Sequence, residues 1–369
     1  MSRLTTMRDR EQGEKGFTLI ELMVAMLIAM VIVAAAFTVL VTSNKATTAN
    51  EQVADTQQNV RLAMELISQD IKLAGFNMTG AIGACVVGIP PQPAPIVPLD
   101  NVPGGAVGTI NDVGPDSVML VVPSMTAGSA GGLPVLTAAA NGGATLVTLA
   151  AADITAMTAA GMVLGSVVSI GGGHASPVTA IGGTTLTLGT PTPSIAPGAI
   201  AFPIGTPVYL LQCVTYAIST APATCGGSTS CLTRNGIPMV DGIEDLQLAY
   251  GCDGCNTVAP NPLGPNGVID EQDASGGTFT QGDLITNNGW GLAPMTPDKI
   301  KVVQVTIVAR QSRAEQGLSE TTSLGINTLG PVVVSDHNPS ADAGYNATTY
   351  SQQRRRLLTR TIQVRNVGS

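Results

Sequence analysis

The hydrophobic positions near the amino end form one long run. From Phe17 to Val41 the only ionisable residue is Glu21. A helix over these positions reaches about 37 Å, which is enough to cross a hydrocarbon layer of about 30 Å. The run predicts a transmembrane segment over residues 17–42. The cationic residues before it predict that residues 1–16 stay in the cytoplasm and that the following chain is exported.

After this run the pattern becomes that of an amphipathic helix. No Gly or Pro occurs between Phe17 and Ala74, so one long helix is predicted in the segment 17–76, with Gly75 as its stop signal. Apolar residues recur at spacings of three, four or seven: Val53, Val60, Ala63, Ile67, Ile71 and Ala74. We expect this apolar face to pack on a globular head.

Beyond the helix, the patterns are those of strands between turn-rich loops. Alternation and β-branched content predict strands over residues 117–122, 145–149, 162–170, 184–188, 208–218, 240–251, 299–310 and 354–366. Loops or irregular chain are predicted over residues 77–115, 252–298 and 311–353, which are rich in Gly, Pro or polar residues. The predicted fold class is therefore α+β, with a long helix packed on an antiparallel-sheet head (residues 77–369). Residues 124–206 form a possible β insertion in that head.

Composition agrees with a turn-rich β head. The chain has 369 residues, of which only 11% are charged, together with 43 Gly and 24 Pro. Without residues 1–16, which carry four cationic and three acidic side chains, the net charge changes from −8 to −9. This acidity argues against general nucleic-acid binding. Arg234 is the only Lys or Arg between Leu73 and Asp298.

All six cysteines lie on the predicted exported side. They are Cys85, Cys213, Cys225, Cys231, Cys252 and Cys255. An even number of cysteines in an oxidising compartment favours disulfides, and six cysteines allow 15 pairings. Cys225 with Cys231 and Cys252 with Cys255 are close enough in sequence to pair locally. Zinc binding is the less favoured interpretation, because export favours oxidation and the chain has only two His residues.

The loop over residues 252–298 contains oxygen ligands that could hold Ca²⁺. These candidates are Asp253, Asn266, Asp270 and Glu271. The full EF-hand pattern is absent, so a plain acidic loop without a cofactor is the simpler interpretation. The sequence also lacks a nucleophile elbow, a P-loop and a metalloprotease motif, so we do not expect an enzyme.

Glu21 needs a specific explanation, because a carboxylate inside an apolar helix is costly. A cleaved secretory signal would have a shorter apolar core and a small-residue cleavage site after it. An ordinary membrane anchor would not require Glu21. A Glu that snorkels to the membrane face is a further alternative.

The stretch from Gly13 to Glu21 resembles the amino-terminal signal of type IV pilins and pseudopilins. Gly16, Phe17, Thr18, Leu19 and Glu21 stand at the offsets of that signal. The resemblance implies that a prepilin peptidase cleaves between Gly16 and Phe17 and that Phe17 is then N-methylated. A buried carboxylate needs a partner, and the amine of a neighbouring subunit would fit. We therefore expect Glu21 to register one subunit against the next in a filament.

Two further regions resemble PilW-like minor pilins. They are the helix end over residues 70–76 and the strand-rich part over residues 232–366, with its Gly-Ile-Glu-Asp-Leu strand and its Arg-rich last strand. The resemblance implies a minor pilin that helps to initiate type IV pilus assembly. A place at the pilus tip is part of what it implies. It implies storage in the bacterial inner membrane with a periplasmic head, and later exposure on the pilus at the cell surface. Its partners would be other minor pilins, the major pilin, the prepilin peptidase and the inner-membrane platform.

Two alternatives remain open at this level. One is a minor pseudopilin of type II secretion, similar to the J component. The other is a binding module, either a tip adhesin or a DNA-uptake subunit.

Overall fold

The computed structural model of the protein describes residues 16–76, 94–99, 114–124, 127–194, 199–255, 267–270, 272, 279–286, 290, 295–313, 331–342 and 344–364. Its α-helices are α1 (Leu19–Leu73), α2 (Ala151–Ala159) and α3 (Ala347–Ser351). Short 3₁₀ helices are η1 (Ser129–Gly131), η2 (Gln281–Asp283), η3 (Pro297–Lys299) and η4 (Pro339–Ala341). The strands are β1 (Ile96–Leu99), β2 (Ser117–Ser124), β3 (Ala140–Asn141), β4 (Leu146–Thr148), β5 (Val167–Ile170), β6 (His174–Ile181), β7 (Thr185–Leu188), β8 (Ile200–Phe202), β9 (Val208–Ser219), β10 (Cys231–Arg234), β11 (Ile237–Asp241), β12 (Ile243–Cys252), β13 (Ile300–Arg310) and β14 (Arg355–Gln363).

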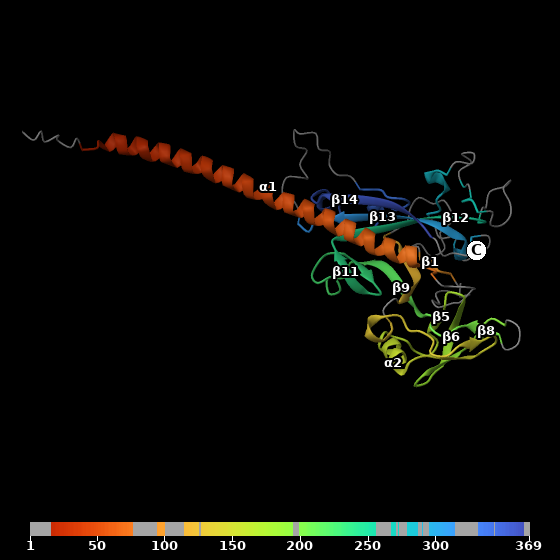
Figure 1. The fold of residues 1–369 in the computed structure, drawn as a ribbon. Coiled ribbons are helices and arrows are strands. Elements are labelled where there is room, and N and C mark those ends of the chain that lie inside the picture. Colours follow the sequence, from red (N-terminus) through yellow and green to blue (C-terminus); the bar gives the residue numbers. More distant parts are fainter. Residues whose placement is uncertain are drawn as a thin grey trace, which may run out of the picture. The chain divides into compact units, whose positions relative to one another are not determined.

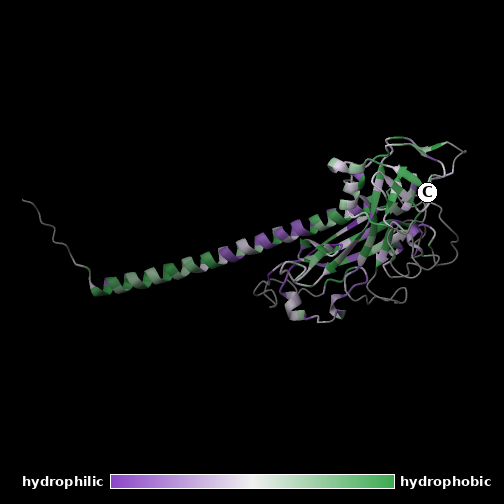
Figure 2. Ribbon diagram, turned by 90° about the horizontal axis from the view of Figure 1, so that it is seen from below, coloured by the Kyte–Doolittle hydropathy of each residue, from purple (hydrophilic) through white to green (hydrophobic). Residues whose placement is uncertain are grey.

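Helix α1 confirms the predicted long helix, and the chain divides into two compact units within it. The first unit ends at Val53, and the second begins at Ala54 and contains the head. From Leu19 to Val41 the helix is almost entirely apolar, as the colouring of Figure 2 shows, and its large apolar side chains are exposed. In the second unit one face of the helix is buried. That face contains Val60, Ala63, Met64, Ile67 and Ile71, each at most 5% exposed.

Most strands of the head belong to one antiparallel sheet, which confirms the predicted fold class (Figure 1). The strand order is β1-β2-β9-β5-β6-β7-β4, and β10 and β11 extend from β9. The twelve-residue β9 is the central strand, because it pairs with β2, β5 and β10 along different parts of its length. A second sheet has the order β12-β13-β14, and β3 pairs with β8.

The main hydrophobic core lies between the buried face of α1 and both large sheets. Its members include Ile67 and Ile71 of α1, Tyr216 of β9, Leu246 of β12 and Ile307 of β13. Helix α1 ends before Gly75, which has φ +73° and donates its backbone N–H to the carbonyl of Val121 at 3.0 Å. This left-handed conformation suits glycine and turns the chain out of the helix.

The region between β2 and β9 has a hydrophobic core of its own. Leu136, Met157, Met162, Ile170 and Leu186 are each at most 1% exposed and belong to this second cluster. The predicted β insertion does contain strands β3 to β8, but it also contains α2, which the sequence pattern did not indicate. The sheet of this region joins that of the head through the pairing of β5 with β9.

Several local predictions were wrong: the loop predicted over residues 311–353 contains α3, and the strand predicted over residues 240–251 is interrupted at Gly242, between β11 and β12. The strand predicted over residues 162–170 is only β5 (Val167–Ile170), because Gly165 at φ +89° forms a turn before it. Residues 77–115 were predicted to be irregular, yet they include β1. Pro98 is tolerated there, because among the described strands β1 pairs with β2 alone and so lies at the edge of the sheet, where a missing donor is harmless.

Candidate functional site

The start of α1 carries the candidate processing and assembly residues. Gly16, Phe17 and Thr18 precede the helix in extended or irregular conformation, and their side chains are exposed. Phe17 is 88% exposed. Among the described residues nothing covers the junction between Gly16 and Phe17, as a peptidase site requires.

Glu21 has a partner within its own chain, and this partner is Thr18. One carboxylate oxygen, Oε2, accepts hydrogen bonds from the Thr18 backbone N–H at 3.0 Å and from its hydroxyl at 2.9 Å. The Thr18 hydroxyl accepts in turn from the Glu21 backbone N–H at 3.3 Å. This is a capping box, in which the first helix residues satisfy each other's free groups. Among the described residues, nothing bonds to the other oxygen, Oε1.

The helix that follows is long and apolar enough to cross a membrane. Within residues 19–41, the large apolar side chains are at least half exposed, so the described part of the chain does not cover them. Such a surface requires either lipid or other apolar helices around it.

A polar cluster fastens the second half of α1 to the head. Asp70 Oδ2 accepts hydrogen bonds from the Tyr216 hydroxyl at 2.7 Å and from Arg234 Nε at 2.9 Å. Tyr216 is 1% exposed, and burial, together with its bond to Asp70, raises the pKa of its hydroxyl. Arg234, the lone cation of the central chain, is thus a partner for the helix. We call Asp70, Tyr216 and Arg234 the helix clamp.

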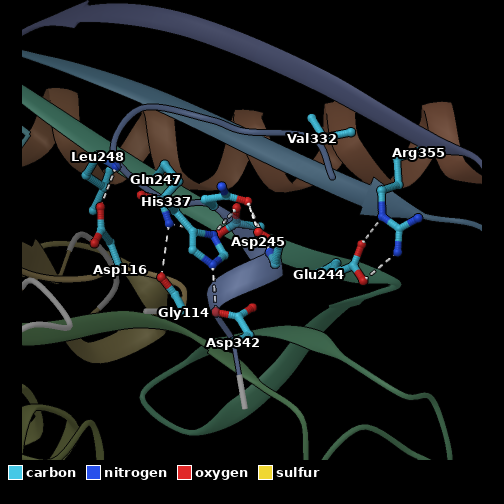
Figure 3. Close-up of polar contacts among 12 residues, drawn as sticks. Gly114, Asp116, Glu244, Asp245, Gln247, Leu248, Val332, His337, Asp342 and Arg355 are labelled. Atoms are coloured by element: carbon cyan, nitrogen blue, oxygen red, sulfur yellow. Dashed lines mark hydrogen bonds and ion pairs between the residues drawn. The ribbon is translucent and has the colours of Figure 1, made fainter. Parts of the chain in front are cut away.

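A second polar cluster lies on the other side of β12 (Figure 3). His337 is 2% exposed and lies between two carboxylates. Its Nδ1 is 2.8 Å from Asp245 Oδ2, and its Nε2 is 3.0 Å from Asp342 Oδ1. Burial lowers the pKa of His337, but the two carboxylates outweigh this effect and raise it to about 9. The imidazole is therefore protonated at neutral pH and has no free nitrogen for catalysis.

Neighbouring groups extend this cluster into the core. Gln247 Nε2 donates to Asp245 Oδ1 at 2.9 Å and to the Gly114 carbonyl at 3.2 Å. Asp116 Oδ2 accepts from the Leu248 backbone N–H at 2.7 Å. These bonds tie β12 to the chain entering β2 and to the segment around His337.

An arginine-rich group stands beside the cluster. Arg355 makes a bidentate ion pair with Glu244, with Nε–Oε2 at 2.5 Å and Nη2–Oε1 at 2.9 Å. Its guanidinium lies 3.2 Å from the ring centroid of Tyr350, in a cation–π contact. Arg310 Nη1 reaches the same Glu244 at 3.3 Å. A cavity of about 390 Å³ opens next to these residues.

The structure describes five of the six cysteines, and all five are disulfide-bonded. Cys225 pairs with Cys231, and Cys252 pairs with Cys255, as sequence proximity indicated. Cys213 is also disulfide-bonded, and Cys85 lies outside the described residues. With their cysteines in disulfides, these positions hold no thiolate for zinc.

Of the four calcium candidates, Asp253 and Asp270 are described, whereas Asn266 and Glu271 are not. Asp270 Oδ2 accepts from the backbone N–H groups of Gly254 and Cys255, at 3.0 and 2.6 Å. Asp253 Oδ2 accepts from the Gly267 N–H at 2.9 Å. Both carboxylates thus bind backbone donors and order this loop.

Sequence reasoning missed several of these contacts. Thr18 could have been found, since Thr-x-x-Glu before an apolar run is a capping signal. Asp70 and Arg234 are 164 residues apart, and Asp245 and His337 are 92 residues apart. No local pattern pairs residues over such separations.

Comparison with known families identifies two regions. The prokaryotic N-terminal methylation motif matches residues 12–37. The family of the type IV pilus-assembly protein W, PilW, matches residues 210–366. No curated protein and no solved structure matches the chain.

Proposed function

We propose that this chain, which belongs to the PilW family of type IV pilins, is a minor pilin that helps to initiate pilus assembly. The observation that carries the proposal is the pairing of a prepilin signal with a PilW-type head on one continuous helix. In this proposal the subunit is stored in the inner membrane through the apolar half of α1. Its head lies in the periplasm and reaches the cell surface with the pilus.

Processing comes first in the proposed mechanism. The prepilin peptidase cleaves between Gly16 and Phe17, and Phe17 is N-methylated. Cleavage converts the Phe17 backbone nitrogen from an amide into a cationic amine. The new charge gives each subunit a group that can pair with a carboxylate in an apolar surrounding.

Glu21 then supplies the carboxylate for assembly. Its Oε2 is held by Thr18, while Oε1 has no partner among the described residues. The amine of a neighbouring subunit can therefore bind Oε1 without breaking the cap of the helix. Thr18 fixes the orientation of the carboxylate, so it acts as a positioning residue.

The experiment compares wild type, Gly16→Val and Glu21→Leu in cells that lack the native copy. We expect Gly16→Val to keep residues 1–16, because a β-branched side chain obstructs the cleavage site. We expect Glu21→Leu to be inserted and cleaved normally, yet to lose co-purification with other minor pilins and to reduce piliation. Mass spectrometry of the amino terminus, membrane levels and pilus counts provide the readouts.

The same strains distinguish a pilus subunit from a secretion pseudopilin. Lost pili with unchanged secretion of exoproteins supports the proposal. Lost secretion with normal piliation would contradict it and would assign the chain to a secretion apparatus.

A further inference from the structure

The cavity beside the second polar cluster is lined by several separate parts of the head. Thr220, Thr229 and Ser230 come from the chain around the Cys225–Cys231 disulfide, and Tyr345 and Thr349 come from the segment at α3. Glu244 of β12 and Arg310 of β13 also line it. Its volume of about 390 Å³ falls in the range of about 300–1,000 Å³ that is usual for small-molecule sites.

The walls are held in place before any ligand arrives. The Ser230 carbonyl accepts from the Gly242 N–H at 2.9 Å, and the Gly242 carbonyl accepts from the Arg310 N–H at 2.8 Å. Gly242 has φ +72°, and a Cβ there would come within 3.1 Å of the Arg310 carbonyl. The adjacent disulfide closes the loop that carries Thr229. A preformed site of this kind loses little conformational entropy on binding.

The charges that line the cavity already neutralise one another. Glu244 is paired with Arg310 and Arg355, while His337 is paired with Asp245 and Asp342. An ionic ligand would bring an uncompensated charge into this partly buried place, at a considerable cost. The cavity therefore favours a neutral ligand.

Ser230 indicates the chemistry of that ligand. The residue is 3% exposed, it lines the cavity, and its hydroxyl has no hydrogen-bond partner among the described residues. A buried hydroxyl without a partner is costly, and a ligand hydroxyl would satisfy it. Tyr345 and Tyr350 also line the cavity and pack against each other with ring centroids 5.4 Å apart, which supplies an aromatic surface.

We propose that this cavity binds a neutral sugar ring. A pyranose offers hydroxyls that both donate and accept, which suits the hydroxyls of Thr220 and Ser230. The Thr229 hydroxyl already accepts from Arg310 Nη2 and can still donate to a sugar oxygen. Its C–H faces suit the aromatic wall at Tyr345. The proposal does not depend on the role of the chain in pilus assembly, because every residue in it belongs to the head.

The test uses the full chain in lauryldimethylamine oxide, a detergent that contains no sugar. Saturation-transfer NMR and calorimetric titration are run with glucose, galactose, mannose and N-acetylglucosamine, and with glucuronic acid and glucosamine as charged counterparts. We expect saturable binding of at least one neutral sugar, and binding of the charged counterparts that is about tenfold weaker or more.

Three variants locate the site. Thr220→Trp, at the exposed rim, should abolish binding, whereas Thr155→Trp on the exposed face of α2 is the matched control and should not change it. Ser230→Ala should raise the Kd by about two- to tenfold through the loss of one hydrogen bond. It should leave the thermal midpoint unchanged or higher, since the unliganded hydroxyl has no partner to lose.

Three outcomes would overturn the proposal. They are the absence of binding by every neutral sugar, equal binding of charged and neutral sugars, and equal effects of Thr220→Trp and Thr155→Trp. A fall in the thermal midpoint of Ser230→Ala would show that its hydroxyl is structural, and this would also count against it.

Discussion

The helix clamp should be what fixes the amphipathic half of α1 to the head, and Arg234→Met tests this directly. Methionine keeps the apolar stem of the side chain but removes the guanidinium. Asp70 would then keep only the Tyr216 hydroxyl as a donor. A buried ion pair that loses one partner costs about 3–5 kcal/mol. The Arg234 and Asp70 side chains are 32% and 14% exposed, so solvent reduces this value.

We therefore expect Arg234→Met to lower the free energy of unfolding by about 1.5–3 kcal/mol, the range for hydrogen bonds to charged groups. Asp70→Asn should cost somewhat less, because Arg234 can turn toward solvent. In the double variant the two losses should not add, and a coupling energy of about 1–2 kcal/mol is expected between groups in direct contact. Urea titration of the full chain, followed by circular dichroism, measures all three values.

Hydrogen exchange then shows where the loss occurs. Amides of α1 over residues 54–73 should exchange faster in Arg234→Met, while those of β13 should change less. The control is Arg360→Met. It removes an ion pair to Glu65 in which the Arg360 and Glu65 side chains are 44% and 69% exposed. We therefore expect the free energy of unfolding to change by no more than about 0.5 kcal/mol. Strictly additive losses at Asp70 and Arg234, or equal effects of Arg234→Met and Arg360→Met, would refute the clamp.

Three further predictions concern other sites. The pKa of His337 rises from 6.5 to about 9 on folding, so its ion pairs stabilise the head fully below pH 6.5 and are lost as the pH rises through about 9. Between pH 6.5 and about 9, the free energy of unfolding of the wild type should therefore fall by on the order of 3 kcal/mol relative to that of His337→Gln, as measured by urea titration. Parallel pH profiles of the two proteins would contradict this. Thr18→Val should leave cleavage intact but reduce piliation, because it removes the hydroxyl that orients Glu21. Thr18→Ser keeps a hydroxyl and should have normal piliation. Equal piliation in both variants would exclude the positioning role. Thiol titration of the denatured, unreduced protein should find no free thiol, and stoichiometric zinc with free thiols would contradict the disulfides.

The parts of the fold that could be read from the sequence are those fixed by local periodicity. Helix α1 was predictable because a run without Gly or Pro leaves no place for it to stop before Gly75. Strands β9, β13 and β14 could be predicted because β-branched and other apolar residues recur along them, and each strand places such residues in the main core. Helix α2 was missed because its Ala- and Thr-rich residues carry little apolar pattern of their own. Its position depends on Ile154 and Met157, which pack into the second core.

The candidate sites divide in the same manner. Gly16, Phe17 and Glu21 follow one another within six positions, so their motif is visible in the sequence. The helix clamp and the cavity require contacts between residues that lie far apart, and these depend on how the sheets pair. Arg234 illustrates the difference: its isolation among uncharged residues was evident, but its partner could be identified only after β10 had been placed beside β9.

Helix α1 must satisfy two requirements that no single sequence pattern could meet. Its first half has an apolar surface that the described residues leave exposed, as a segment surrounded by lipid or by other apolar helices requires. Its second half has one buried apolar face and one specific attachment to the head, the helix clamp. The capping box at Thr18 and the clamp at Asp70 stand near the two ends of this helix. No Gly or Pro interrupts the chain between them, so both contacts lie on one continuous helix.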